Sequence, residues 1–299
     1  MQYAFHSWQT VLFLTLVACT QNNELKEIPD VELEFVPITA EGNTLNDPLG
    51  RYALTNDFEI MTTELSLRQF ELIMAYDSRS GKTDQYGDEH TSPAHFVSWH
   101  MAADLANQWS AFQQLEECYQ CDGYQTTVTC QINPQLQSIY DCKGFRLPTE
   151  AEWELAGRAG SKSEFWTGEG DLLGGTYDRD ECQGNELIQD NALNPSLSNY
   201  AWYCGNNEPD STKVVGSLLP NSYELHDMHG NVWEWTHDAT GEFPAADTNP
   251  VVDGEPLKVI RGGSFHNNPY DLRVSFRAII SGTSRMSGYG FRLVRTLEQ

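Results

Sequence analysis

The chain has 299 residues, and 39% of them are hydrophobic, which is enough apolar material for one large domain or two small ones. Its 43 acidic residues outnumber the 18 basic residues and give a formal charge of -25. Because such a surface repels phosphate backbones, this composition excludes nucleic acid as a partner. It would attract cations, and Ca²⁺ is the obvious hard cation outside the cytoplasm.

The N-terminus has the features of an export signal. Residues 11–18 form an apolar run that is too short to span a bilayer, so we expect residues 1–18 to be a signal peptide. The run ends in Leu16-Val17-Ala18-Cys19, which resembles a bacterial lipobox and implies that Cys19 is lipidated, although no Lys or Arg precedes it. The alternative is that Cys19 is an ordinary cysteine. Thr20, rather than Asp, follows Cys19, which favours an anchor in the outer membrane or at the surface of the bacterial cell envelope.

The segment after the signal is polar and acidic. Residues 19–50 are therefore expected to be a lipidated, flexible tether, and residues 51–299 to be one globular domain.

Regular elements are predicted mainly in the first half of this domain. Ser66 caps a helix, and Thr149 with Glu152 forms a capping-box signature at the start of another. After Gly160 the sequence becomes rich in Gly, Asn and aromatic residues and has few periodic runs. Alternation and helical spacing predict strands over 58–61 and 95–99, and helices over 67–73, 101–112 and 150–156.

Six cysteines follow Cys19, an even number that suggests disulfides in an exported chain. The stretch 125–129 is prone to form a strand of a hairpin-like insertion, which a nested pairing would staple. The alternative for the first four cysteines is a tetrahedral zinc site. The pairings considered are Cys118–Cys142, Cys121–Cys130 and Cys182–Cys204.

Four motifs stand in a fixed order along the domain, preceded by the shorter stretches 58–64 and 96–99. The motifs are FRLPTEAEWE at 145–154, GNVWEW at 230–235, RGGSF at 261–265 and GFRLV at 290–294. Together they resemble the sulfatase-modifying-factor family, whose namesake is the formylglycine-generating enzyme. The resemblance implies an α+β, C-type-lectin-like fold with little regular secondary structure, stabilised by Ca²⁺ and disulfides.

The resemblance also implies Ca²⁺ ligands around the tryptophan motif. The matching positions are the side chains of Asp227 and Glu234 and the backbone carbonyls of Gly230 and Val232, a mixture of hard oxygen ligands that suits Ca²⁺. The alternative is that the two acids brace a turn. A second Ca²⁺ site of the family would use Asn199 and the backbone of Tyr200, closed by an acid such as Asp210, across a loop that is shorter and rearranged here.

The copper site of the formylglycine-generating enzyme does not match. That enzyme holds Cu(I) with two cysteines just after the Gly-Gly-Ser motif, because Cu(I) requires soft thiolates. Here Asn267 and Leu272 occupy those positions, and the last cysteine of the chain is Cys204. We therefore expect no bound copper and no catalytic residues of the family type, unless Cys182 or Cys204 reaches Asn267 as a free thiol.

Other patterns are weaker. His226, His229 and His237 have metal-ligand spacing, but we expect them to line the surface of the Ca²⁺ loop. No nucleophile-elbow pattern surrounds a serine. Residues that could line a ligand groove are His266, Asn267, Arg273, Ser275, Arg277 and Trp202.

Two classes of function remain. The first is an exported scaffold without catalytic activity that binds a peptide, a protein or a small ligand. The second is an oxidoreductase that modifies proteins through a non-standard site. The missing cysteine pair favours the scaffold.

Overall fold

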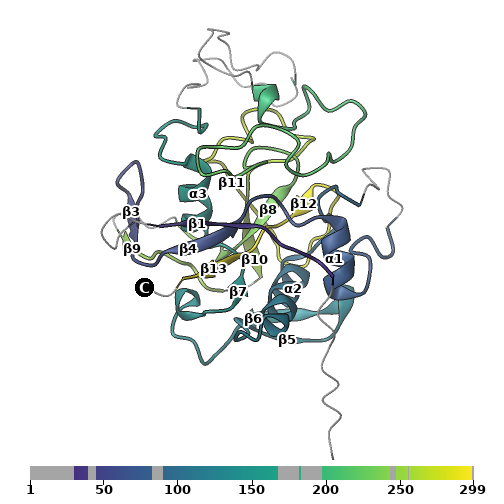
Figure 1. Cartoon of the computed structure of the whole chain (residues 1–299), viewed down its shortest axis with the longest axis vertical. Helices are drawn as coiled ribbons and strands as arrows, with labels where there is room; N and C mark the ends of the chain where they lie inside the picture. Colours follow the sequence, from purple (N-terminus) through teal and green to yellow (C-terminus); the bar gives the residue numbers. More distant parts are fainter. Residues whose placement is uncertain are drawn as a thin grey trace, which may run out of the picture.

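The structure is a computed structural model that describes residues 30–39, 45–82, 90–167, 182, 197–242, 247–254 and 256–297. Helices are few and loops are long, as expected for the α+β class (Figure 1). The expected signal peptide (1–18) and the expected lipidation site Cys19 lie outside the described residues. Within the described residues, no helix has the length and apolar character needed to span a bilayer.

Two four-stranded sheets form the centre of the domain. The first has the order β1-β4-β13-β7, with antiparallel neighbours throughout. The second has the order β11-β10-β8-β12, in which only the short β12 runs parallel to its neighbour β8. The strands are β1 (Phe35–Ile38), β4 (Phe58–Met61), β7 (Phe145–Arg146), β8 (Trp233–Ala239), β10 (Leu257–Arg261), β11 (Arg277–Ser281), β12 (Tyr289–Gly290) and β13 (Val294–Thr296).

Strand β1 corrects the predicted domain boundary. The tether was expected to run to residue 50, but β1 pairs with β4 along its whole length, and Ile38 is buried. Residues 45–54 also belong to the domain, because β2 (Leu45–Asn46) pairs with β3 (Tyr52–Leu54), which in turn pairs with β9 (Asp247–Thr248). Short strands of this kind gain stability from their neighbours rather than from their own sequence, so polar composition misled the prediction.

The helices begin where the capping residues predicted. Ser66 and Thr149 both form capping boxes, at the start of α1 (Leu67–Met74) and of α3 (Glu150–Arg158). Helix α2 (Trp99–Phe112) begins at Ser98, so the expected strand over 95–99 is wrong: the capping serine places Trp99 in the first helical turn. Trp99, Trp153 and Trp235 are among the largest fully buried side chains of the core.

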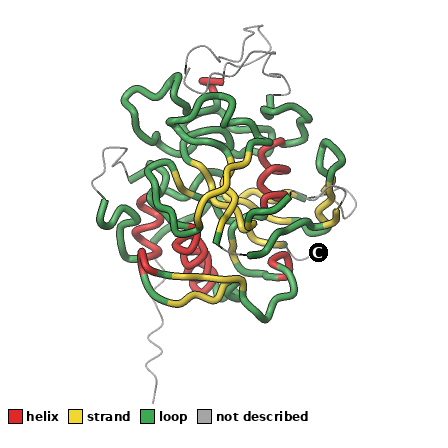
Figure 2. The backbone as a smooth tube through the Cα atoms, turned by 180° about the vertical axis from the view of Figure 1, so that it is seen from behind, coloured by secondary structure: helices red, strands yellow, loops and turns green. Residues whose placement is uncertain are grey.

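A disulfide-bonded hairpin packs against α2. Strand β5 (Tyr119–Asp122) pairs with β6 (Thr129–Ile132), and Cys121 lies directly opposite Cys130. The expected strand over 125–129 is largely a turn of 3₁₀ helix, η1 (Gln125–Thr127), because these residues make the turn of the hairpin. Figures 1 and 2 show the hairpin and α2 at one end of the molecule, with the long loops at the other. Two more 3₁₀ turns, η2 (Ile139–Asp141) and η3 (Leu197–Asn199), lie in loops.

All three cysteine pairings are confirmed. The structure has disulfides Cys118–Cys142, Cys121–Cys130 and Cys182–Cys204, so the zinc alternative is wrong. The third disulfide belongs to the loop-rich end, where a small second apolar cluster is separate from the main core. That cluster consists of Phe165, Leu197, Tyr200, Ala201, Tyr203 and Leu272, with Trp166 and Cys204 packed against it.

Candidate functional site

The loop after β10 contains Asn267 and Leu272, the two positions at which the resemblance implies copper-binding cysteines. Gly262 and Gly263 have positive φ angles of 91° and 78°, so the chain leaves the sheet through two left-handed residues. Asn267 Oδ1 accepts hydrogen bonds from Trp233 Nε1 (2.9 Å) and Ser264 Oγ (2.7 Å), and its Nδ2 donates to Asp271 (2.8 Å). Leu272 is fully buried in the second apolar cluster. The two positions are therefore filled by a bonded carboxamide and a packed side chain.

Cys204 lies beside this loop, but its sulfur is not free. Its backbone N–H donates to the carbonyl of Asn267 (3.1 Å), while its sulfur is bonded to Cys182. All six cysteines after Cys19 are paired in this way. The condition that would have restored a thiol site at Asn267 is thus not met in this structure.

The candidate groove residues divide into two groups. Ser275 donates to Glu164, and Arg277 forms a bidentate ion pair with Glu150, so both are committed to contacts within the domain. Trp202 is partly buried, and its indole donates to Ser217 Oγ (3.0 Å).

The second group remains partly open to solvent. The guanidinium of Arg273 lies 3.8 Å from the ring centroid of Tyr270, and its Nε donates to the Tyr270 carbonyl. His266 is exposed at the same loop and pairs with Asp210 (3.1 Å). Arg273 and His266 are therefore the groove candidates whose polar groups are best placed to meet a ligand.

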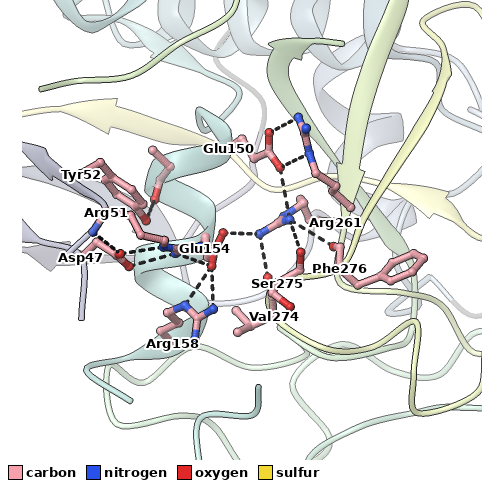
Figure 3. Close-up of polar contacts among 12 residues, drawn as sticks. Asp47, Arg51, Tyr52, Glu150, Glu154, Arg158, Arg261, Val274, Ser275 and Phe276 are labelled. Atoms are coloured by element: carbon pink, nitrogen blue, oxygen red, sulfur yellow. Dashed lines mark hydrogen bonds and ion pairs between the residues drawn. The ribbon is translucent and has the colours of Figure 1, made fainter. Parts of the chain in front are cut away.

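A buried network of ion pairs joins α3 to β10 and to the backbone of residues 274–276, and sequence patterns did not reveal it (Figure 3). Glu154 on α3 accepts hydrogen bonds from Arg51 (2.6 Å), Arg158 (2.7 Å) and Arg261 (2.7 Å). Burial alone would raise the pKa of Glu154, but Arg261, Arg158 and Arg51 together hold it below its usual range. Arg261 also donates to the carbonyls of Val274, Ser275 and Phe276, which anchors the chain segment after Arg273.

Three of the four expected Ca²⁺ ligands lie in the turn that leads into β8, and Glu234 is the second residue of that strand. Asp227 is buried, and its Oδ2 accepts from the backbone N–H of Gly216 (2.7 Å). Its Oδ1 is buried and has no hydrogen-bond partner among the described residues. Val232 is fully buried, and Gly230 packs against the backbone of Trp202 so closely that a Cβ would lie 2.0 Å from the Trp202 carbonyl oxygen. The orphaned oxygen of Asp227 fits a cation ligand.

The carboxylate of Glu234, the fourth expected Ca²⁺ ligand, already has hydrogen-bond donors. Arg292 forms a bidentate ion pair with it (2.7 Å for each bond), and Trp153 Nε1 donates to the same carboxylate (2.9 Å). All three residues are fully buried. The charge of Glu234 is therefore already compensated by a guanidinium.

The residues of the second expected Ca²⁺ site make contacts within the domain. The carbonyl of Asn199 accepts from the Leu219 N–H, and the ring of Tyr200 packs against Trp166. The carboxylate of Asp210 contacts His266 and Asn207. Across the described residues, no three His, Cys, Asp or Glu side chains converge as a metal-binding group.

Two of the three histidines do not line the surface as expected. His229 and His237 are buried, and burial lowers the pKa of each to about 4. His229 Nδ1 bonds the Leu272 carbonyl (2.7 Å), while His237 lies between Tyr119 and Asp253. Both hold loops in place as neutral rings.

Comparison with known proteins agrees with this architecture. The family model described as the sulfatase-modifying factor enzyme 1-like domain matches residues 29–297. The chain is similar to the chaperone protein LppX of Paenibacillus barcinonensis, with 25% identity over 87% of this chain and 89% of that protein. It is also similar to the formylglycine-generating enzyme of Thermomonospora curvata, with 30% identity over 50% of this chain, and it spans 48% of that enzyme's length.

A solved structure shows the same fold. Treponema denticola variable protein 1 superposes with a TM-score of 0.65 and 25% identity, over 91% of this chain and 98% of that protein. The match with the family model begins at residue 29, which agrees with the placement of β1 inside the domain.

Proposed function

Because the chain belongs to the family of the sulfatase-modifying factor enzyme 1-like domain, we propose that it is a member without oxidase activity that binds another protein. The observation that carries the proposal is that its cysteine thiols are bonded in disulfides. Every cysteine after Cys19 is in a disulfide, and Asn267 and Leu272 stand where relatives place the copper thiolates. Neither a carboxamide nor an alkyl side chain can replace a thiolate for Cu(I).

The binding surface in this proposal is the loop-rich end around residues 264–273 and Trp202. A half-buried arginine stacked on a tyrosine is a common anchor in protein interfaces. The similarity to a chaperone protein over nearly its full length supports a protein as the partner, rather than a small molecule.

We further propose that the protein is exported and anchored to the bacterial cell envelope through Cys19, and that it binds Ca²⁺ in the turn before β8. The anchor rests on the lipobox-like sequence. The Ca²⁺ proposal is based on the buried Oδ1 of Asp227, which has no hydrogen-bond partner among the described residues. The carbonyls of Gly230 and Val232 would add further oxygen ligands, and the carboxylate of Glu234, which also accepts from Arg292, would be the fourth.

Copper titration tests the lack of oxidase activity. We expect no tight Cu(I) binding by the purified, disulfide-bonded protein and no O₂ consumption with a cysteine-containing peptide, because no thiolate is present after Cys19. The formylglycine-generating enzyme of Thermomonospora curvata, measured in parallel, is the positive control. Stoichiometric Cu(I) binding with peptide-dependent O₂ uptake would instead support the oxidoreductase alternative.

A further inference from the structure

Glu64 is a buried carboxylate without a compensating donor. It follows β4 and is 0% exposed, and neither Oε1 nor Oε2 has a hydrogen-bond partner among the described residues. Burying a carboxylate in this way costs several kcal/mol, about as much as a fold can tolerate at one site. A group of this kind normally has a partner that the protein chain itself does not supply.

The orphaned oxygens of Glu64 and Asp227 belong to one site. The carboxyl group of Glu64 interacts directly with that of Asp227, whose Oδ1 is the third buried oxygen without a donor. Two acids from segments 163 positions apart in the chain, one after β4 and one before β8, thus face each other inside the fold.

The charge around this pair does not balance. Glu64 interacts electrostatically with both Asp227 and Glu234, and the guanidinium of Arg292 acts on all three acids, while the ring of His226 acts on Asp227. Arg292 is committed to Glu234 and to the carbonyls of Met61 and His226. When all three carboxyl groups are ionised, they exceed the one guanidinium by two negative charges, which one divalent cation would neutralise.

A shared proton relieves this site less completely than a cation. One proton forms one O–H···O bond and so satisfies two of the three orphaned oxygens, leaving the third without a partner. A Ca²⁺ ion coordinates several oxygens at once, including carbonyls and water, and prefers carboxylates. The ligand type and the missing charge both favour the ion.

We propose that Glu64 and Asp227 together bind a divalent cation of the Ca²⁺ type, with Glu64 as a direct ligand. This inference rests on the Ca²⁺ part of the proposed function, because it shares Asp227. It changes the ligand set, since Glu64 takes the role of second carboxylate that the family pattern assigns to Glu234. Glu234 then serves to hold Arg292 beside the site.

The test is a comparison of the wild-type protein with Glu64→Gln after treatment with EDTA and desalting. Ca²⁺ affinity is measured by isothermal titration calorimetry at neutral pH, and Tm is measured with Ca²⁺ and with EDTA. We expect Ca²⁺ to raise the Tm of the wild type. In Glu64→Gln the affinity should fall at least tenfold, and the Tm gain should shrink by more than half.

The same variant should also change the Tm of the protein without Ca²⁺, in the opposite direction. In EDTA, Glu64→Gln should have a higher Tm than the wild type, because it removes the repulsion and gives Asp227 a donor. The control is Glu59→Gln, which removes the same charge from β4, where Glu59 pairs with Arg295 near the surface. It should keep the wild-type Ca²⁺ affinity and Tm gain.

The outcomes separate the claims. Wild-type Ca²⁺ binding that Glu64→Gln leaves unchanged would overturn the role of Glu64 while sparing the proposed Ca²⁺ site. A wild type that neither binds Ca²⁺ nor changes its Tm would overturn both. The proposed lack of oxidase activity is decided separately by the copper titration.

Discussion

His229 is a buried histidine that stabilises the fold as an uncharged ring. Its ring packs against Phe165 and Tyr200, and its Nδ1 bonds the carbonyl of Leu272. Burial lowers its pKa from 6.5 to about 4, so the folded protein takes up this proton at a lower pH than the unfolded chain does. Its contribution to stability is therefore fully present above pH 6.5 and is lost as the pH falls towards 4.

Replacing His229→Asn should reduce the dependence of stability on pH. Asn keeps a donor for the Leu272 carbonyl but takes up no proton. Between pH 7 and pH 5 the wild type should lose about 2 kcal/mol more unfolding free energy than the variant, from one proton at about 1.4 kcal/mol per pH unit. Urea unfolding at both pH values measures this difference. Between pH 7 and pH 8 the two proteins should change in parallel, and a difference there would argue against the assignment.

At the scale of elements, the approach of the Trp202 segment to the start of β8 depends on one glycine. Gly230 has a φ of 90°, its N–H donates to Gly262, and Trp202 and Gly230 form a parallel bridge. This contact joins the loop at 202–207 to the turn that carries Asp227. A side chain at this position would separate the two.

Gly230→Ala is expected to destabilise the fold by at least about 3 kcal/mol, from backbone strain of roughly 1–2 kcal/mol and a clash with the Trp202 carbonyl. Gly160 is the matched control. Its φ of 86° is similar, but a Cβ there meets nothing within 4 Å, so Gly160→Ala should cost only about 1–2 kcal/mol. Denaturant unfolding of the two variants measures the difference. Equal losses would show that the contact with Trp202 adds nothing.

Across the whole molecule, the buried ion network connects parts that are distant in sequence. Arg51 from the turn between β2 and β3, Arg158 from α3 and Arg261 from β10 converge on Glu154 (Figure 3). Arg51 also pairs with the buried Asp47, which fastens the segment expected to be a tether. Such a network fixes how the sheets and α3 pack together. Removing one member of a buried ion pair strongly lowers the free energy of unfolding, because the other member keeps its charge without a partner.

Glu154→Gln should therefore lower the free energy of unfolding by about 3–5 kcal/mol, because it removes the buried carboxylate that Arg51, Arg158 and Arg261 share. Glu59→Gln, at the partly exposed pair with Arg295, should cost only about 0–1 kcal/mol. Chemical denaturation at neutral pH compares the two. A small loss in Glu154→Gln would mean that solvent reaches the network.

The sequence was informative where physical rules act locally. Ser66 and Thr149 marked helix starts because a capping side chain bonds backbone N–H groups within the same turn. The cysteine pairings were also correct. The boundary at residue 51 and the strand at 95–99 were wrong, because strand pairing and the cap at Ser98 depend on neighbours that local composition does not reveal.

By itself, the sequence determined the family and the absence of any cysteine after Cys204, because both depend on which residue types are present and in what order. It suggested the disulfide pairings, which the structure then fixed. Only the tertiary structure decided which charges meet. It paired Glu234 with Arg292, gathered three arginines around Glu154, and left Glu64 facing Asp227. The reason is physical: the free energy of a buried charge depends on the groups around it in space, and these come from segments that the order of residues does not bring together.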